Sequence, residues 1–510
     1  MGSSQEHIVM LPFMAQGHLI PFLGLAKQIQ QRFGFTITIA STPLNVNYLK
    51  STIAKDSTAS TETQIHLVEL PFNSTDHGLP PNTENTEALS LAQIVNLFHS
   101  STALEAPFRS LMNEITVKDG QPPLCIISDF FMGWATDVAK SCGTVNVSFT
   151  TGGAYGTAAY MSLWQHLPHR STGEDEFCLP GFPNSSRFHV SQLHQYLRDA
   201  DGTDPWSRFF QPQISLSLGS FGWLCNTVEE IEPLGLDVLK KIKRLPIWCI
   251  GPLIPPRMLS TESSSASGSR IIGRHAGVEP GVSPDRCLEW LDMHSEQSVV
   301  YISFGSQNTI GPSQMMALAM GLEDSKKPFI WAIRPPVGNN VRGEFKPEWL
   351  PQGFEEEMAK TKQGLLVHKW APQLEILCHK SIGAFISHCG WNSIMESLSQ
   401  GVPIIGWPLA AEQNYNSKML MEEMGVSIEL TRGLQSIITK DDVKRVINIV
   451  MDRGGKGKEM KKKAAEIGEL IRASVKEDGS FKGSSIKAMD DFVSALLSTK
   501  GKGLIIPNGI

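Results

Sequence analysis

The segment FISHCGWNSIMES, residues 385–397, carries more polar chemistry than a turn from a strand into a helix needs. Ser393 and Glu396 form the pattern S-x-x-E, a capping box, and helix initiation alone would explain both residues. It does not explain His388 or Trp391. The start of a helix presents free N–H groups and the positive end of the helix dipole, so it can bind an anion. With an imidazole donor beside these groups, the segment predicts a pyrophosphate site.

His18 and Asp129 are the candidates for catalysis, because each follows an apolar strand-like run in the N-terminal half. The carboxyl ends of neighbouring parallel strands lie at one edge of a sheet, so we expect both side chains on the same rim. A His–Asp pair can act as a general base, since the carboxylate fixes the imidazole tautomer and stabilises the imidazolium. The alternative is that the histidine caps a turn and the aspartate caps a helix.

Groups that suit a planar base and sugar hydroxyls lie on either side of residues 385–397. The stretch Trp370-Ala371-Pro372-Gln373 follows a strand, and an exposed indole there could stack on a planar base. Glu412 and Gln413 end a further strand, and adjacent acceptor and donor groups of this kind suit sugar hydroxyls. Gly305-Ser306 ends another strand and could present backbone N–H groups to a phosphate, although such a turn alone is weak evidence.

The elements that must position these residues alternate between strands and helices. An apolar run at 7–13, helically spaced apolar residues from 19 to 33 with Pro21 in the first turn, and a β-rich run at 35–40 predict a β-α-β unit. Later strands are expected at 124–127, 299–304, 329–333, 365–368, 382–387, 402–406 and 426–430. This pattern predicts an α/β fold with parallel sheets covered on both faces.

A chain of 510 residues is too long for one ordinary core, so we expect two domains. The first should span 1–253 and the second 285–480. Residues 254–284 contain a polar low-complexity tract at 260–269 and are expected to form a linker or flexible loop. A helix within 481–510 should dock back on the first domain. Ligands would gather at strand ends, in a cleft between the domains.

The bulk properties exclude several classes of function. A net charge of −6 offers no basic surface for nucleic acid, and the Lys-rich run at 454–463 indicates a solvated helix face. No stretch reaches the roughly 18 apolar residues of a membrane span, and no secretory signal is visible. The eight cysteines lack C-x-x-C spacing, which is typical of reduced thiols. We therefore expect a cytoplasmic monomer.

The stretch from Trp370 to Gln413 resembles the 44-residue signature box of plant family-1 UDP-dependent glycosyltransferases, with WAPQ, HCGWNS, ES, GVP and EQ in place. The resemblance covers almost the whole chain through GHLIP, PLCIISD, NTVEEIEP, IGPL, CLEWLD and VVYISFGS. It implies a GT-B fold, in which two Rossmann-like domains face each other across a cleft. The acceptor would bind mainly in the first domain and the nucleotide sugar mainly in the second. Transfer would be inverting and independent of metal.

The matched positions divide among the parts of a UDP-sugar. For uridine the resemblance implies Trp370, Ala371, Gln373 and Glu396. For the diphosphate it implies Ser306, His388, Asn392 and Ser393. For the sugar it implies Trp391, Glu412, Gln413 and, from a looser match, Thr151. Glutamine at the last position of the box resembles glucose users, so UDP-glucose is the expected co-substrate, with no permanently bound cofactor.

The predicted mechanism joins these groups. His18, held by Asp129, would remove the proton from an acceptor hydroxyl, whose oxygen would attack C1 of the sugar. His388 and the helix start would meet the charge on the departing UDP.

The acceptor is less defined. Apolar residues of the N-terminal half could line its pocket, or could equally belong to the core: Phe13, Met14, Met132, Trp134 and Trp164. Such a pocket would favour flat or bulky lipophilic molecules such as flavonoids, other phenolics or triterpenoids. The accepting hydroxyl could belong to an aglycone or to an existing sugar.

Three alternatives remain. A metal-dependent transferase could use Asp199-Ala200-Asp201, but this D-x-D lies in a polar loop. A dinucleotide dehydrogenase would need GxGxxG in the first β-α turn, and the glycines at 152–156 do not fit that pattern. A non-catalytic UDP-sugar sensor would not need His18 and Asp129.

Overall fold

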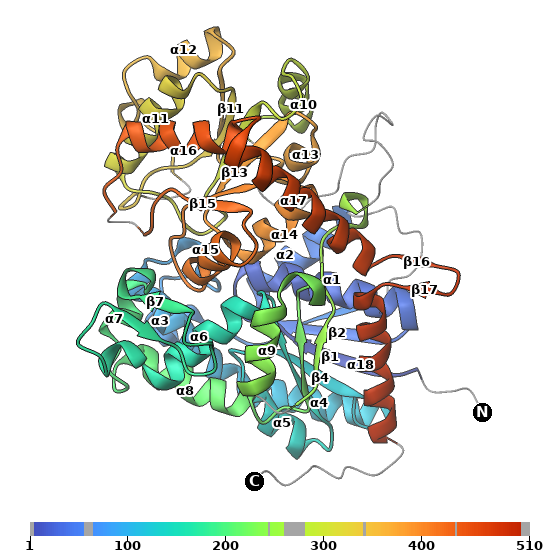
Figure 1. Cartoon of the computed structure of the whole chain (residues 1–510). Coiled ribbons are helices and arrows are strands. Elements are labelled where there is room, and N and C mark those ends of the chain that lie inside the picture. The colour runs from blue at the N-terminus through green and yellow to red at the C-terminus, as the bar shows by residue number, and fades with distance from the viewer. Residues whose placement is uncertain are drawn as a thin grey trace. The chain divides into compact units, whose positions relative to one another are not determined.

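The computed structural model of the chain describes residues 5–55, 65–242, 245–259, 281–339, 343–433 and 436–500. The polar tract at 260–269 lies outside the described residues. Contacts divide the chain into two compact units. The first comprises 1–188, 195–253 and 474–510, and the second comprises 189–194 and 254–473. Each unit holds a parallel sheet with helices packed on it, so the predicted α/β class is confirmed (Figure 1).

The first unit is built on a seven-stranded sheet of order β3-β2-β1-β4-β5-β8-β9, in which all neighbours are parallel. Its strands are β1 (His7–Leu11), β2 (Thr36–Ser41), β3 (Ile65–Glu69), β4 (Cys125–Asp129), β5 (Asn146–Thr150), β8 (Gly222–Cys225) and β9 (Ile247–Cys249). Its helices are α1 (Gln16–Phe33), α2 (Pro43–Lys55), α3 (Leu91–Ser100), α4 (Glu105–Asp119), α5 (Ala135–Ser141), α6 (Ala154–His166), α7 (Gln195–Asp199), α8 (Pro205–Ser217), α9 (Pro233–Ile242) and α18 (Ser484–Lys500). A separate two-stranded sheet joins β6 (Glu176–Cys178) to β7 (Arg187–His189).

The alternation of side chains along each strand decides what each face of this sheet meets. Val147 and Phe149 of β5 join the core formed with α1 and α18. Asn146 and Ser148 alternate with these two residues and face the opposite side of the sheet. Ser148 donates to a carbonyl of α8, and Asn146 donates to Thr136 of α5. The order of strands reverses between β1 and β4. The carboxyl ends of these two strands therefore flank the position where ligands of parallel α/β sheets bind.

The C-terminal helix α18 belongs to the first unit, and Figure 1 shows it in red beside the strands of that unit. Its buried face, formed by Met489, Phe492, Val493 and Leu496, packs in the same core as α1. The ring of Phe492 lies 5.2 Å from that of Trp248 of β9 in an edge-to-face contact. The sequence predicted that the chain returns to the first unit at residue 481. The contacts place this return at residue 474, before the hairpin of β16 (Glu477–Asp478) and β17 (Phe481–Lys482).

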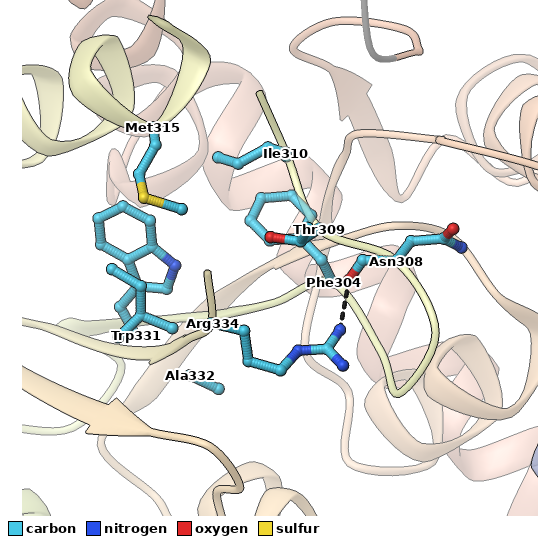
Figure 2. Close-up of a pocket in the computed structure, with 9 residues that line it drawn as sticks. Phe304, Asn308, Thr309, Ile310, Met315, Trp331, Ala332 and Arg334 are labelled. Atoms are coloured by element: carbon cyan, nitrogen blue, oxygen red, sulfur yellow. Dashed lines mark hydrogen bonds between the residues drawn. The ribbon is translucent and has the colours of Figure 1, made fainter. Parts of the chain in front are cut away.

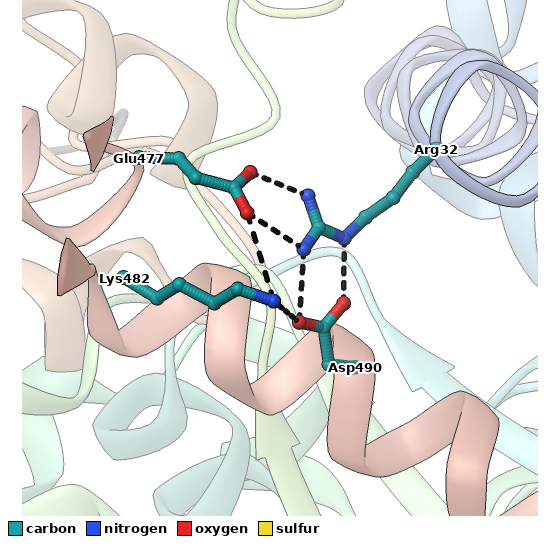
Figure 3. A network of polar contacts seen from close by, with 4 residues as sticks. All are labelled: Arg32, Glu477, Lys482 and Asp490. Carbon is teal, nitrogen blue, oxygen red and sulfur yellow. Dashed lines mark hydrogen bonds and ion pairs between the residues drawn. The ribbon is translucent and has the colours of Figure 1, made fainter. Parts of the chain in front are cut away.

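A network of four charged residues ties this return to α1 (Figure 3). Arg32 makes two hydrogen bonds to Asp490, at 2.6 and 2.8 Å, and a third to Glu477 at 2.7 Å. Lys482 lies 2.7 Å from the same carboxylate of Asp490. The hydrogen bonds from Arg32 are the largest cause that lowers the pKa of Asp490 to about 2.

Replacing Asp490 by Asn is expected to destabilise the protein by about 1–2 kcal/mol at pH 7, because the lowered pKa reflects a favourable interaction of the charged form. The contribution is fully present above the ordinary aspartate pKa of about 4 and is lost as the pH falls through about 2. The difference in stability between wild type and Asp490→Asn, measured by thermal unfolding, should be constant from pH 7 to 5 and should narrow in acid. Asp491→Asn, at the exposed next position, is the control. An equal loss there would contradict the prediction.

The second unit is built on a six-stranded parallel sheet of order β12-β11-β10-β13-β14-β15. Its strands are β10 (Val299–Ser303), β11 (Phe329–Ile333), β12 (Gly364–His368), β13 (Ile382–Ser387), β14 (Ile404–Gly406) and β15 (Ser427–Glu429). Its helices are α10 (Pro284–Asp292), α11 (Pro312–Ser325), α12 (Phe354–Lys360), α13 (Gln373–Cys378), α14 (Trp391–Ser399), α15 (Gln413–Glu422), α16 (Lys440–Met451) and α17 (Gly455–Ser474), the last of which ends at the unit boundary.

Both faces of this second sheet are also covered. Val300 and Ile302 of β10 pack with α11 and α16, whereas Val299 and Tyr301 of the same strand pack with α10 and α13. Its strand order reverses between β10 and β13, so the loops after these two strands flank the expected ligand position. Among the described residues, no helix has the length and apolar character needed to cross a membrane.

Candidate functional site

The first unit brings His18 and Asp129 into direct contact at the strand-order reversal. Nδ1 of His18 lies 2.6 Å from Oδ2 of Asp129. The carboxylate is fully buried, and its second oxygen accepts the N–H of Phe131 at 3.0 Å. The imidazole remains partly exposed, with 20% of its side-chain surface accessible. A fixed carboxylate and a partly accessible imidazole are the arrangement that a general base requires.

The helix that carries His18 begins earlier than the sequence suggested. Its first residue is Gln16, with Ala15 in an extended conformation as the N-cap, and the carbonyl of Ala15 accepts the N–H groups of His18 and Leu19. The expectation that Pro21 lies in the first turn of a helix whose apolar spacing begins at residue 19 was therefore wrong. Because His18 is itself in the first helical turn, the helix directs the His18 side chain toward Asp129 of β4.

Thr151 lies next to this pair, directly after β5. Its hydroxyl is 3.4 Å from Nδ1 of His18, and its backbone carbonyl accepts the side-chain amide of Asn226 at 3.2 Å. The side-chain oxygen of Asn226 in turn accepts the backbone N–H of Leu253. Asn226 opens the NTVEEIEP stretch, so this landmark of the sequence has a structural role in holding the strand ends around His18.

The five residues predicted for an acceptor pocket are all buried. Phe13 is the one placed against His18, with ring centroids 5.6 Å apart, and it stacks on Phe98 at 4.5 Å. Trp134 packs edge-to-face on Phe108, and Trp164 stacks on Phe210. Met14 and Met132 are fully buried. An aromatic cluster therefore continues from His18 into the unit, and the assignment of these residues to an acceptor pocket stays a prediction.

Four strand ends of the second unit share an unusual backbone conformation. Gly305 after β10, Lys369 after β12, Cys389 after β13 and Ala411 after β14 all have positive φ, between 52° and 76°. This left-handed region is costly for residues other than glycine, and such strain concentrates where a binding site demands a particular turn. Each of these four residues stands within one position of a predicted site residue. The backbone therefore supports a binding site at this edge of the sheet.

Two of the residues predicted for uridine, Gln373 and Glu396, belong to one hydrogen-bonded group. The side-chain amide of Gln373 donates to Oε2 of Glu396 at 2.6 Å and to the hydroxyl of Ser393 at 3.0 Å. The hydroxyl of Tyr301 donates to the amide oxygen of Gln373 at 3.2 Å. Glu396 is fully buried, while Trp370 is half-buried and follows the strained Lys369.

The capping-box interpretation of Ser393 and Glu396 was wrong. Helix α14 begins at Trp391 with Gly390 as its N-cap, so Ser393 is already the third helical residue. The helix starts three residues earlier than S-x-x-E suggests, which leaves both side chains for the group around Gln373. The indole of Trp391 is buried, so at this first helical position the backbone N–H is the group presented by the helix start. Asn392 is half-buried.

His388 is enclosed by glycine backbone. A Cβ at Gly305 would lie 2.7 Å from Nε2 of His388, and one at Gly390 only 2.4 Å from it. Within the described residues, its buried Nδ1 has no hydrogen-bond partner. Burial, together with the nearby charge of Arg334, lowers the pKa of His388 to about 4. The side chain is therefore a neutral imidazole near pH 7.

Gln413 and Glu412 have different surroundings. The amide oxygen of Gln413 accepts the N–H groups of Leu409 and Ala410, both at 2.9 Å, so this oxygen holds the loop after β14. Glu412 is half-buried, and Oε1 lies 3.5 Å from the amide of Asn416. Of the adjacent pair predicted to bind sugar hydroxyls, Gln413 is therefore the residue whose side chain supports this loop.

The comparisons with known proteins agree with this geometry. Residues 5–255 match the family described as "Glycosyltransferase, N-terminal domain", and residues 278–466 match "UDP-glucoronosyl and UDP-glucosyl transferase". Crocetin glucosyltransferase 3 of Crocus sativus is 46% identical over 88% of this chain and 91% of its own length. UDP-glycosyltransferase 92A1 of Arabidopsis thaliana is 41% identical over 97% of each chain.

The chain belongs to the plant family-1 UDP-glycosyltransferases. A solved structure of such an enzyme from Glycyrrhiza uralensis, complexed with glycyrrhetinic acid 3-O-monoglucuronide, superposes with a TM-score of 0.80 at 27% identity, covering 98% of this chain and 97% of that one. One from Polygonum tinctorium that glucosylates indoxyl gives 0.76 at 26% identity, covering 97% and 99%. The predicted GT-B fold is confirmed. This UDP-glycosyltransferase transfers a sugar from a UDP-sugar to a small molecule.

Two residues of this UDP-glycosyltransferase site were missed by the sequence reasoning. Tyr301 lies inside β10 and looked like core, and only the fold shows its hydroxyl bound to Gln373. Arg334 directly follows β11, and its guanidinium donates to backbone carbonyls of the loop after β10. A charged residue at the end of an apolar strand was the signal that could have found Arg334.

Proposed function

We propose that this enzyme transfers glucose from UDP-glucose, with inversion at C1, to a hydroxyl of a lipophilic plant molecule. The observation that carries the proposal is the 2.6 Å contact between His18 and Asp129, because it supplies the base that an inverting transfer needs. Gln413 at the end of the signature box and the name of the glucosyltransferase from Crocus sativus favour glucose as the sugar.

His18 is the proposed general base. With Nδ1 donating to Asp129, the lone pair on Nε2 accepts the proton of the acceptor hydroxyl. The oxygen then forms the new bond to C1 of glucose, and the bond from C1 to the diphosphate oxygen breaks with its electron pair on UDP. Asp129 stabilises the imidazolium that results. Thr151, 3.4 Å from His18, is proposed to approach the sugar.

The second unit is proposed to hold the donor. Trp370 stacks on uracil beside Ala371, and Gln373 binds the uridine while Glu396 accepts the ribose hydroxyls. His388 donates to the diphosphate together with the helix start at Asn392 and Ser393 and with Ser306. Glu412, Gln413 and the N–H of Trp391 are assigned to the sugar. A neutral His388 keeps one ring N–H, which can donate a hydrogen bond to the diphosphate.

The acceptor is proposed to be a flavonoid, another phenolic or a triterpenoid. The aromatic cluster that begins at Phe13 supports this class, since aromatic side chains pack on flat apolar rings. We further propose a cytoplasmic monomer that needs no metal. The D-x-D alternative is weakened by Asp201, whose carboxylate accepts the N–H groups of Thr203 and Asp204 and so stabilises a turn.

The test is to incubate the purified protein with UDP-glucose and a panel of flavonoids, other phenolics and triterpenoids, including some glycosides. We expect released UDP and an equal amount of β-glucoside, with UDP-galactose and UDP-glucuronic acid as poorer donors and no effect of EDTA. The position of the new glycosidic bond identifies the accepting hydroxyl. Binding of UDP-glucose without release of UDP for any acceptor would instead indicate the non-catalytic sensor.

A further inference from the structure

Arg334 makes an unusual set of contacts with one short loop. Its guanidinium donates to the backbone carbonyls of Gly305 and Ser306, both at 2.5 Å. It also donates to the backbone carbonyl of Asn308, the contact drawn in Figure 2. These residues form the loop after β10, at the strand-order reversal of the second sheet. Three carbonyls of one loop therefore point toward a single side chain that follows the neighbouring strand.

The planarity of the peptide bond fixes the direction of the N–H groups on the other side of the loop. In a trans peptide the C=O of one residue and the N–H of the next point in opposite directions. Because the carbonyls of Gly305 and Ser306 point at Arg334, the N–H groups of Ser306 and Gln307 point away from it. Neither N–H donates to another group of the described chain. Successive N–H groups aimed at one side form an anion-binding nest.

The surroundings explain why the loop needs such support. It lies over a small pocket lined largely by apolar side chains, among them Phe304, Ile310, Met315 and Trp331 (Figure 2). Gly305 has a φ of 76°, so the turn itself is conformationally permissive. Without the guanidinium the three carbonyls would lack their common donor, and the N–H groups of the loop would lose their common direction.

We propose that Arg334 is a positioning residue, which holds the loop after β10 so that the N–H groups of Ser306 and Gln307 bind the diphosphate of the UDP-sugar. The inference rests on the proposed assignment of this unit to UDP. A planar guanidinium holds five N–H donors in a fixed fork that matches carbonyls at fixed positions, whereas a lysine ammonium is a compact charge whose three donors rotate. Arg334 also places a permanent positive charge near His388, where it adds to burial in lowering the pKa of that imidazole.

The experiment compares the affinities of full-length Arg334→Met and Arg334→Lys for UDP and for uridine, using calorimetry or competition binding. Both variants should bind UDP about 10- to 100-fold more weakly than wild type, because charge-assisted hydrogen bonds hold the loop. Uridine affinity should be unchanged. Arg445→Met, at an exposed position of the same unit, is the matched control and should bind both like wild type.

Three outcomes overturn the inference. If Arg334→Lys binds UDP like wild type, charge alone is sufficient and the orientation of the loop is not what Arg334 provides. If uridine binding falls as much as UDP binding, Arg334 supports the whole unit rather than the diphosphate loop. If Arg334→Met binds UDP normally, the residue has no role in the site. A wild-type protein that fails to bind UDP would refute the proposed function as well.

Discussion

Replacing His18 by Ala is expected to lower sugar transfer by about 100- to 10,000-fold, the usual contribution of a general base, while leaving the affinity for UDP unchanged. The imidazole is the proposed acceptor of the hydroxyl proton, and its 2.6 Å contact with Asp129 fixes the ring for that task. The residues proposed for UDP all belong to the other unit, so their contacts should survive. Turnover is measured by UDP release, and UDP affinity by calorimetry.

The chain supplies a matched control for this experiment. His7 and Asp119 form a second histidine–aspartate pair, with Nδ1 of His7 2.7 Å from the carboxylate. His7 is the first residue of β1, so this pair lies at the amino end of the strand, whereas His18 follows its carboxyl end. His7→Ala should therefore remain active. Unchanged turnover in His18→Ala would refute the assignment of the base, and equal losses in both variants would point to damage to the first unit.

The parallel sheet is the part of the fold that sequence reasoning reached best. A strand buried on both faces is a nearly continuous apolar run, so β11 and β13 occupy the predicted ranges 329–333 and 382–387 without change. Polar residues that follow such runs, directly or in the next turn, are expected at the carboxyl edge of the sheet. This rule located His18, Asp129 and His388 before any contact was known.

Helix starts and side-chain partners were harder to predict from the sequence than the strands. The S-x-x-E pattern at Ser393 predicted a cap in the wrong place, because Gly390 in an extended conformation had already started the helix. Arg334 was missed because its acceptors are backbone carbonyls, which carry no signature in the sequence. The aromatic residues near Phe13 remained ambiguous for another reason. The same residue types suit a core and the wall of an apolar pocket.

Gly390→Ala is expected to lower kcat/KM for UDP-glucose by about 100-fold, although the fold should be kept. Gly390 has a φ of −67°, which any residue can adopt. The three atoms that a new Cβ would meet most closely all belong to the imidazole of His388, the nearest at 2.4 Å. The substitution should therefore displace His388 and little else. Gly454→Ala, whose Cβ would have its nearest contact at 3.7 Å, is the control for a glycine lost in the same unit.

A double mutant isolates the cause. If Gly390 matters because it leaves room for the imidazole, then Gly390→Ala should cost little more once His388 has been replaced by Ala. Additive losses would mean that the new methyl group disturbs the start of α14 or excludes the donor directly. Transfer at the wild-type rate in Gly390→Ala alone would mean that the position of His388 is unimportant. Non-additive losses would show that Gly390 acts through His388, because the imidazole needs backbone without a side chain at position 390 to keep its place beside the diphosphate.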